Sequence, residues 1–187
     1  MALATWWRTD LLPALAPLPT FSVQLSDDRE LIARLAHCSP RIIDARFEAG
    51  DRLYLAFMDE KPAAYGWVTT HKGYITDLRL TFALPAHNSY LYDFLTLPEW
   101  RGHGIYPRLL QAIIRQEESC ERFWIGYRPG NEASARGMSK AGFQIICDLV
   151  VTQSRASGLI LFEQSEHALA SSGVFQLPIV ATESSSR

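Results

Sequence analysis

The chain has 187 residues, a formal net charge of -2 and a hydrophobic fraction of 48%. A chain of this length buries about 70% of its unfolded surface as one domain, so it needs neither a disulfide nor a metal for stability. The charge argues against a long nucleic acid as partner, because such binders carry a basic excess. A small anionic ligand is compatible with this composition if positive groups gather at one place.

The three cysteines, Cys38, Cys120 and Cys147, are odd in number, widely separated and without a CxxC pair. This spacing indicates neither a disulfide framework nor a zinc site. We therefore expect a cytoplasmic protein without a bound metal.

The first 20 residues are apolar enough to resemble a signal peptide. Arg8, Asp10 and three prolines interrupt any hydrophobic core of such a peptide, and no basic region precedes it. Residues 1–20 are therefore expected to form an arm outside the domain. No other window reaches the roughly 20 apolar residues of a membrane span, so no membrane partner is expected.

Local signals predict helices and strands in mixed order. Asp27 and Glu30 form a capping-box pattern, and Pro40 and Gly50 are a typical start and stop of a helix. The expected helices are 27–37, 40–49, 105–117 and 131–142; the expected strands are 52–60, 64–70, a weakly indicated 74–82, 91–97, 123–127, 143–151 and 158–164. The domain is expected to span residues 21–163, followed by a mobile tail at 164–187. This order predicts an α/β or α+β fold with helices on both faces of a mixed sheet.

The segment 98–110, PEWRGHGIYPRLL, joins an expected strand to an expected helix. Backbone N–H groups at the start of a helix bind phosphate, and glycine lets a ligand approach them closely. Pro107 suits the first turn of a helix but removes one such donor. The segment therefore predicts a modified phosphate loop.

Three segments resemble the GNAT superfamily of acyl-CoA-dependent N-acyltransferases. RGHGIY is similar to the family's Q/R-x-x-G-x-G/A pyrophosphate loop, in which Arg101 and Gly104 match and Tyr106 departs. NEASARGMSKAGF resembles the second signature of the family, and KPAAYGWV resembles the hairpin strand before the central strand. The resemblance implies a mostly antiparallel central sheet with two splayed parallel strands in its middle, expected at 91–97 and 123–127.

The resemblance also implies acetyl-CoA as cosubstrate, with its pantetheine arm between the two splayed strands. The residues expected to contact it are Leu95, Thr96 and Leu97 on the first strand, Arg101, Gly102, His103, Gly104, Ile105 and Tyr106 in the loop, and Asn131 and Ser134 in the second signature.

The sequence departs from the family at its catalytic positions. Many relatives carry a tyrosine proton donor where this chain has Met138, and a thioether cannot donate a proton. Tyr127 is the substitute candidate. Asp93 is the only carboxylate on strand 91–97 and a candidate base, although strand alternation turns it away from the expected face unless a bulge redirects it. Tyr92 is a further candidate.

Other residues near the acceptor side remain open as alternatives. His87 and Asp77 could also act as base, and an aromatic acceptor lining would comprise Tyr74, Tyr90, Tyr92, Trp67 and Trp124. The sequence thus predicts an N-acetyltransferase that moves acetyl from acetyl-CoA to a small-molecule amine by direct attack in a ternary complex. One alternative uses a longer acyl-CoA or an acyl carrier protein as donor. The other is a non-catalytic acyl-CoA-binding module, and the sequence indicates no oligomeric state.

Overall fold

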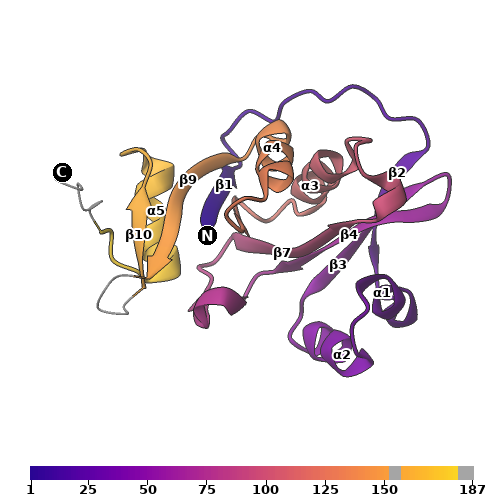
Figure 1. Cartoon of the computed structure of the whole chain (residues 1–187), viewed down its shortest axis with the longest axis horizontal. Helices are drawn as coiled ribbons and strands as arrows, with labels where there is room; N and C mark the ends of the chain where they lie inside the picture. Colours follow the sequence, from indigo (N-terminus) through magenta and orange to yellow (C-terminus); the bar gives the residue numbers. More distant parts are fainter. Residues whose placement is uncertain (152–156, 181–187) are drawn as a thin grey trace.

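The computed structural model describes residues 1–151 and 157–180, which form an eight-stranded sheet, a two-stranded sheet and five α-helices (Figure 1). The large sheet has the order β10-β9-β1-β8-β7-β4-β3-β2. Its pairs are antiparallel except β7 and β8, which run parallel. The predicted mixed, mostly antiparallel sheet with helices on both faces is thereby confirmed.

The strands are β1 (Ala2–Trp7), β2 (Phe21–Ser26), β3 (Arg52–Met58), β4 (Lys61–Thr69), β5 (Lys72–Ile75), β6 (Leu80–Ala83), β7 (Asn88–Thr96), β8 (Arg122–Tyr127), β9 (Gln144–Val151) and β10 (Ser157–Leu161). The helices are α1 (Arg29–Ala36), α2 (Pro40–Glu48), α3 (Ile105–Gln116), α4 (Glu132–Ala141) and α5 (Glu166–Phe175). Short 3-10 turns lie at Thr76–Leu78 and Pro98–Trp100.

Residue types with strong local preferences set several of these boundaries. Pro40 is the first residue of α2, as predicted, because its missing N–H would have no partner there. At α1 the cap is Asp28 rather than the expected Asp27. The Asp28 carboxylate accepts a 2.8 Å hydrogen bond from the N–H of Leu31, so α1 begins at Arg29, one residue later than a cap at Asp27 would give.

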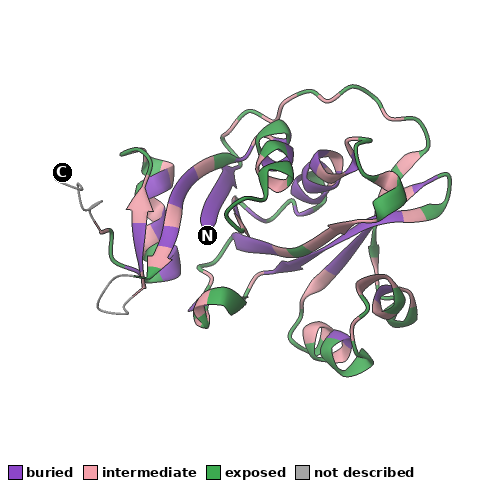
Figure 2. Cartoon of the chain, in the orientation of Figure 1, coloured by how far each residue is buried: buried purple, intermediate pink, exposed green. Residues whose placement is uncertain are grey.

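The N-terminal segment is part of the sheet, which corrects the expected arm at residues 1–20. β1 lies between β8 and β9 and pairs antiparallel with both. All six of its residues are buried, as the purple strand in Figure 2 shows. A central strand buried on both faces reads as a continuous apolar run, and such a run can be mistaken for a signal-like arm.

The C-terminal segment is also folded where it is described, which corrects the expected mobile tail. Ser165 caps α5 by accepting the N–H of Ala168, and α5 packs against β6, β9 and β10. Val174 and Phe175 are buried in a core cluster that also contains Trp124 and Leu159. The rest of the predicted tail, 181–187, lies outside the described residues.

The weakly predicted strand at 74–82 is instead a small hairpin. β5 and β6 pair with each other, and the 3-10 turn Thr76–Leu78 separates them. Arg79 follows this turn at φ 48°, a left-handed conformation that reverses the chain. The hairpin places residues 75–77 beside the end of β8, where the candidate site lies.

Helices cover the two faces of the sheet in separate groups. α3 and α4 pack on one face over a core that contains Leu109, Ile113 and Phe123. α1 and α2 lie on the other face and cover Trp67 and Leu55. Figure 1 shows the two pairs of helices on opposite sides of the large sheet. Within the described ranges, no helix is both long and apolar enough to cross a membrane.

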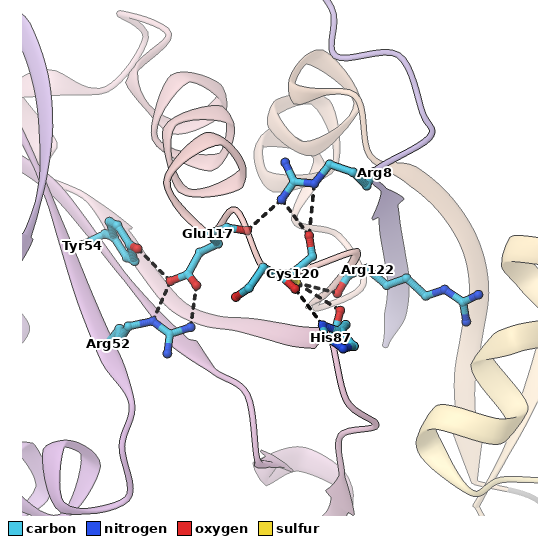
Figure 3. A network of polar contacts seen from close by, with 8 residues as sticks. Arg8, Arg52, Tyr54, His87, Glu117, Cys120 and Arg122 are labelled. Atoms are coloured by element: carbon cyan, nitrogen blue, oxygen red, sulfur yellow. Dashed lines mark hydrogen bonds and ion pairs between the residues drawn. The ribbon is translucent and has the colours of Figure 1, made fainter.

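A buried carboxylate fixes the C-terminal end of α3 (Figure 3). The Glu117 side chain is 7% exposed and accepts two 2.6 Å hydrogen bonds from Arg52 and one of 2.7 Å from the hydroxyl of Tyr54. Arg8, just after β1, donates to the backbone carbonyls of Ile114, Glu117 and Cys120. These bonds tie α3 to β3 and to the β1 segment, and they anchor the helix whose other end forms part of the site.

Candidate functional site

The parallel strands β7 and β8 separate in the middle of the sheet. Their pairing runs from Asn88 opposite Arg122 to Leu91 opposite Ile125. Beyond this point the two strands, with α2, the β5–β6 hairpin, α3 and α4, enclose a cavity of about 510 Å³. Its lining comprises Met1, Arg46, Tyr74, Ile75, Thr76, Asp77, Tyr90, Leu91, Tyr92, Asp93, Phe94, Tyr106, Ile125, Gly126, Tyr127, Arg128, Asn131 and Ser134.

A β-bulge in β7 brings Asp93 toward the α2 side of this cavity. Tyr92 pairs with Trp67 of β4 and Leu95 pairs with Tyr65, so two residues of β7 face the single Gly66. Asp93 has φ 51°, which breaks the strand alternation at this residue. The bulge therefore redirects the Asp93 side chain, which is the condition on which its predicted role depended.

Phe94, the second residue of the bulge, turns to the opposite face. A Cβ atom on Gly66 would lie 2.1 Å from the Phe94 ring, so only glycine leaves room for this ring. The ring also makes an edge contact with Tyr106 of α3, with centroids 5.7 Å apart. The bulge thus places an acidic group on one side of β7 and an aromatic ring on the other.

Asp93 forms an ion pair with Arg46 of α2, with 2.5 Å between Oδ2 and the guanidinium nitrogen. The guanidinium lies over the rings of Trp67 and Tyr92, at 4.9 and 5.2 Å from their centroids. The Asp93 side chain is 38% exposed, so one carboxylate edge remains open to the cavity. Arg46 was not among the sequence-predicted site residues.

Tyr92 does not have a free hydroxyl. It donates a 2.6 Å hydrogen bond to Asp51, and burial, this hydrogen bond and the charge of Asp51 raise its pKa. A phenol that keeps its proton and donates it to Asp51 cannot accept a proton from an amine. The Tyr92 hydroxyl is thus engaged with Asp51, and its ring forms a wall of the cavity.

Tyr127, the substitute candidate for the proton donor, lies at the end of β8 and lines the cavity. Burial, followed by the negative charges of Asp148 and Glu132, raises its pKa. Its phenol therefore keeps its proton at neutral pH and can donate a hydrogen bond into the cavity.

Other candidate bases are placed differently. Asp77 lines the cavity but forms two hydrogen bonds of 2.8 and 2.9 Å with Arg128. His87 lies at the opposite end of β7, where its Nδ1 meets the carbonyl of Ser119 at 3.0 Å. Of the predicted aromatic lining, Tyr74, Tyr90 and Tyr92 face the cavity, whereas Trp67 and Trp124 are buried in the core.

The loop 101–106 has the geometry of an anion-binding turn. Gly102 and Gly104 have φ of 83° and 71°, and Gly104 is the N-cap of α3 without a side-chain capping bond. The first N–H groups of a helix have no partner within the helix, and they carry its positive dipole end. A Cβ on Gly102 would meet nothing within 4 Å, so the loop has space for a ligand beside it.

The side chains of this loop are partly engaged with the backbone. Arg101 donates from Nε to the carbonyl of Thr96 at 3.2 Å, and the Nδ1 of His103 lies 3.0 Å from the carbonyl of Arg101. Leu97 donates its N–H to Ala63. The predicted residues Leu95, Thr96, Leu97 and 101–105 lie at the end of β7 and at the start of α3, and they are not among the residues that line the cavity.

Tyr106 fills the space left by a glycine on α4. A Cβ on Gly137 would lie 2.4 Å from the Tyr106 ring, and the Tyr106 hydroxyl lies 3.4 Å from Oγ of Ser134. Asn131 caps α4 by accepting the N–H of Ser134 at 3.1 Å. These three predicted residues meet at the α3–α4 side of the cavity, while Met138 is 1% exposed and packs in the core.

Comparison with known proteins identifies the family. A sequence profile described as Acetyltransferase (GNAT) family matches residues 15–143. No curated protein matches the chain. Among solved structures, a protein from Novosphingobium aromaticivorans assigned to GNAT acetyltransferases has a TM-score of 0.53 at 17% identity, covering 77% of this chain and 59% of that one.

Two further structures share the fold at low identity. AAC(6')-Iy, solved with the bisubstrate analog CoA-S-monomethyl-acetylneamine, has a TM-score of 0.51 at 16% identity, covering 66% of this chain and 90% of that one. A GCN5-related N-acetyltransferase from Kribbella flavida has a TM-score of 0.52 at 14% identity, covering 90% of this chain and 60% of that one. The chain thus spans less than two thirds of two of these three proteins. On the match over residues 15–143, the chain belongs to the GNAT acetyltransferase family.

Proposed function

We propose that the protein is an N-acetyltransferase that transfers acetyl from acetyl-CoA to the amine of a small molecule within a ternary complex. The observation that carries this proposal is the cavity between β7 and β8. One side of it is bordered by α3 and α4, and the other side carries the Arg46–Asp93 pair of α2 and β7. Donor and acceptor can therefore enter from opposite sides and meet between the strands.

The α3–α4 side fits the donor. The pyrophosphate of coenzyme A would accept hydrogen bonds from the backbone N–H groups of Gly102 to Tyr106 at the positive end of α3. The pantetheine arm would follow the open edge of β7 toward Asn131, whose side-chain nitrogen remains able to donate. AAC(6')-Iy shares the fold and was solved with a bisubstrate analog, which supports the simultaneous binding of two substrates in this fold.

The transfer needs an amine nitrogen with a free electron pair. An ammonium ion first releases one proton to water, and the neutral amine then attacks the thioester carbonyl carbon. A C–N bond forms, the C–S bond breaks, and the amine's second proton and the thiolate yield free thiol. Asp93 accepts a hydrogen bond from the amine and orients it. The protonated phenol of Tyr127 donates a hydrogen bond to the departing sulfur and stabilises its negative charge.

The test measures thiol release from acetyl-CoA with a panel of small amines, together with acetyl-CoA binding by calorimetry. Release that depends on both acetyl-CoA and an amine is expected. Faster release with a longer acyl-CoA would assign a different donor, and tight coenzyme binding without any transfer would assign a non-catalytic binding module. Absence of both coenzyme binding and release would refute the proposal.

A further inference from the structure

Arg46 is bound to Asp93 through one guanidinium nitrogen, and its charge lies over the rings of Trp67 and Tyr92. A contact with an aromatic ring supplies no oxygen acceptor, so the other guanidinium N–H groups remain available to donate hydrogen bonds. The side chain is only 21% exposed, and it lines the cavity.

The hydrogen bonds of Arg46 leave most of its donors unused. A guanidinium has five N–H groups. Across residues 1–151 and 157–180, Arg46 donates a single hydrogen bond, to Asp93. Donors that are mostly shielded from water favour a partner, and a planar carboxylate matches the guanidinium edge with two parallel bonds.

The other arginine of the cavity lining differs. Arg128 binds both oxygens of Asp77 through two of its nitrogens, and its side chain is 73% exposed. Its charge is already matched and screened by solvent. Of the two arginines that line the cavity, Arg46 is therefore the one with donors to spare, and it lies directly beside the negative Asp93.

We propose that the acceptor is an amino acid or a close analogue, an amine that carries a carboxylate one or two carbons from its nitrogen. The carboxylate binds the free edge of Arg46, and the amine group binds the open edge of Asp93. A positive and a negative protein group side by side match such a zwitterion better than they match a simple amine or a polyamine. This assignment rests on the proposed acetyltransferase function.

The charge arrangement also favours turnover. Acetylation converts the cationic amine into a neutral amide and leaves the carboxylate unchanged. Asp93 then loses the ammonium group of the substrate as a partner, while Arg46 keeps its contact with the carboxylate. The product therefore binds more weakly than the substrate, which promotes its release.

The test compares acceptors that differ only in the carboxylate. Phenylalanine is compared with 2-phenylethylamine, and leucine with 3-methylbutylamine, by kcat/KM at saturating acetyl-CoA. The wild type is expected to favour the amino acid of each pair by about tenfold or more, the effect of hydrogen bonds to a charged group. In Arg46→Gln this preference should fall to about one, mainly through a higher KM for the amino acid of each pair.

Two variants separate this role from a structural one. Arg46→Lys keeps the charge but loses the bidentate edge, so it should retain part of the preference. Arg29→Gln is the matched control. Like Arg46, Arg29 pairs with an aspartate at 2.5 Å, here Asp44 of α2, and lies over an aromatic ring, that of Phe47, but it is not among the residues that line the cavity. It should leave the preference unchanged.

Binding distinguishes failure of this inference from failure of the proposed function. With coenzyme A bound, phenylalanine and 2-phenylethylamine are titrated into the wild type and into Arg46→Gln, and the binding of each ligand is followed by NMR. Stronger binding of phenylalanine that Arg46→Gln abolishes would support the assignment even if no acetyl is transferred. Equal or better binding and use of the simple amines by the wild type, or a preference that Arg46→Gln does not change, would overturn it.

Discussion

Asp93 lies at the cavity because β7 contains one more residue than β4 at this point. The extra residue takes φ 51° and turns its side chain toward Arg46 on α2. The conformation is accommodated where Gly66 lies opposite, since any larger residue would collide with Phe94. A carboxylate, an arginine and a glycine from three separate elements therefore define the acceptor side of the site.

The predicted phosphate loop depends on a left-handed residue at the start of α3. Gly104 has φ 71°, and a Cβ there would also lie 2.5 Å from the Arg108 guanidinium, which donates to the Gly104 carbonyl at 2.7 Å. Left-handed backbone costs an L-residue about 1–2 kcal/mol, and a β-branched one more. Gly104→Val should therefore reshape the loop and raise the Kd for acetyl-CoA by about tenfold or more, as measured by calorimetry.

A glycine outside the loop provides the matched control for Gly104→Val. Gly50, after α2, has φ 82°, and a Cβ there would lie at an ordinary 3.7 Å from His71. Gly50→Val introduces similar backbone strain far from α3 and should leave the Kd unchanged. Equal Kd values for the two variants and the wild type, with both proteins folded, would contradict the assignment of residues 102–106 to the phosphate.

At the residue scale, the sequence shows which chemical groups are present but not which residues surround them. It shows that Met138 carries no proton donor and that Asp93 is the only carboxylate on its strand. The sequence could not place Arg46, which is 47 positions from Asp93 and pairs with it only because α2 packs over β4. It also could not reveal that the Tyr92 hydroxyl donates a hydrogen bond to Asp51, 41 positions away.

At the scale of elements, α3 and α4 pack closely because a large residue on one helix lies against a glycine on the other. Tyr106 of α3 reaches into the space beside Gly137 of α4. On helix propensity alone, Gly137→Ala would stabilise the protein by about 1 kcal/mol. A Cβ at 2.4 Å from a half-buried ring causes overpacking, which costs about 1–3 kcal/mol. Gly137→Ala should therefore lower the free energy of unfolding in urea.

Removal of the ring should reverse the sign of this effect. In a Tyr106→Ala background the space beside α4 is open, and adding Gly137→Ala should now raise the free energy of unfolding. The double-mutant cycle reports the coupling between the two positions directly. Stabilisation by Gly137→Ala in the wild type would show that Tyr106 does not pack against α4 as described.

Elements with local start and stop signals were predicted, and those defined by pairing were not. α2 begins at its proline and the β3–β4 hairpin follows its alternating pattern, so both could be found from the sequence. β1 has no turn linking it to either neighbour, because its partners β8 and β9 are more than a hundred residues away. α5 was missed because its sequence, rich in alanine and serine, resembles that of a mobile tail.

At the scale of the whole molecule, burial of tyrosines makes stability depend on alkaline pH. Burial raises the pKa of Tyr65 to about 12 and that of Tyr106 to about 12. Burial also raises the pKa of Tyr54, Tyr90 and Tyr92. In the unfolded chain a tyrosine ionises near pH 10. The folded protein therefore holds protons that the unfolded chain releases as pH rises.

This difference fixes the sign of the pH dependence. The stabilising contribution of each tyrosine is complete below about pH 10 and is lost as pH rises to about 12, because only the unfolded state ionises in that interval. Two pKa units correspond to about 2–3 kcal/mol for each buried group. The free energy of unfolding in urea, measured from about pH 8 to about pH 12, should fall steeply above about pH 10.

Phenylalanine substitutions isolate the contribution of each hydroxyl. Tyr65→Phe and Tyr106→Phe remove a titrating group and keep the ring, so each should reduce the slope of stability against pH above about pH 10. Tyr74→Phe serves as control, because Tyr74 is 54% exposed on the β5–β6 hairpin. An unchanged slope in Tyr65→Phe and Tyr106→Phe would mean that these phenols ionise as easily in the folded protein as in the unfolded chain, which would contradict the raised pKa of both groups.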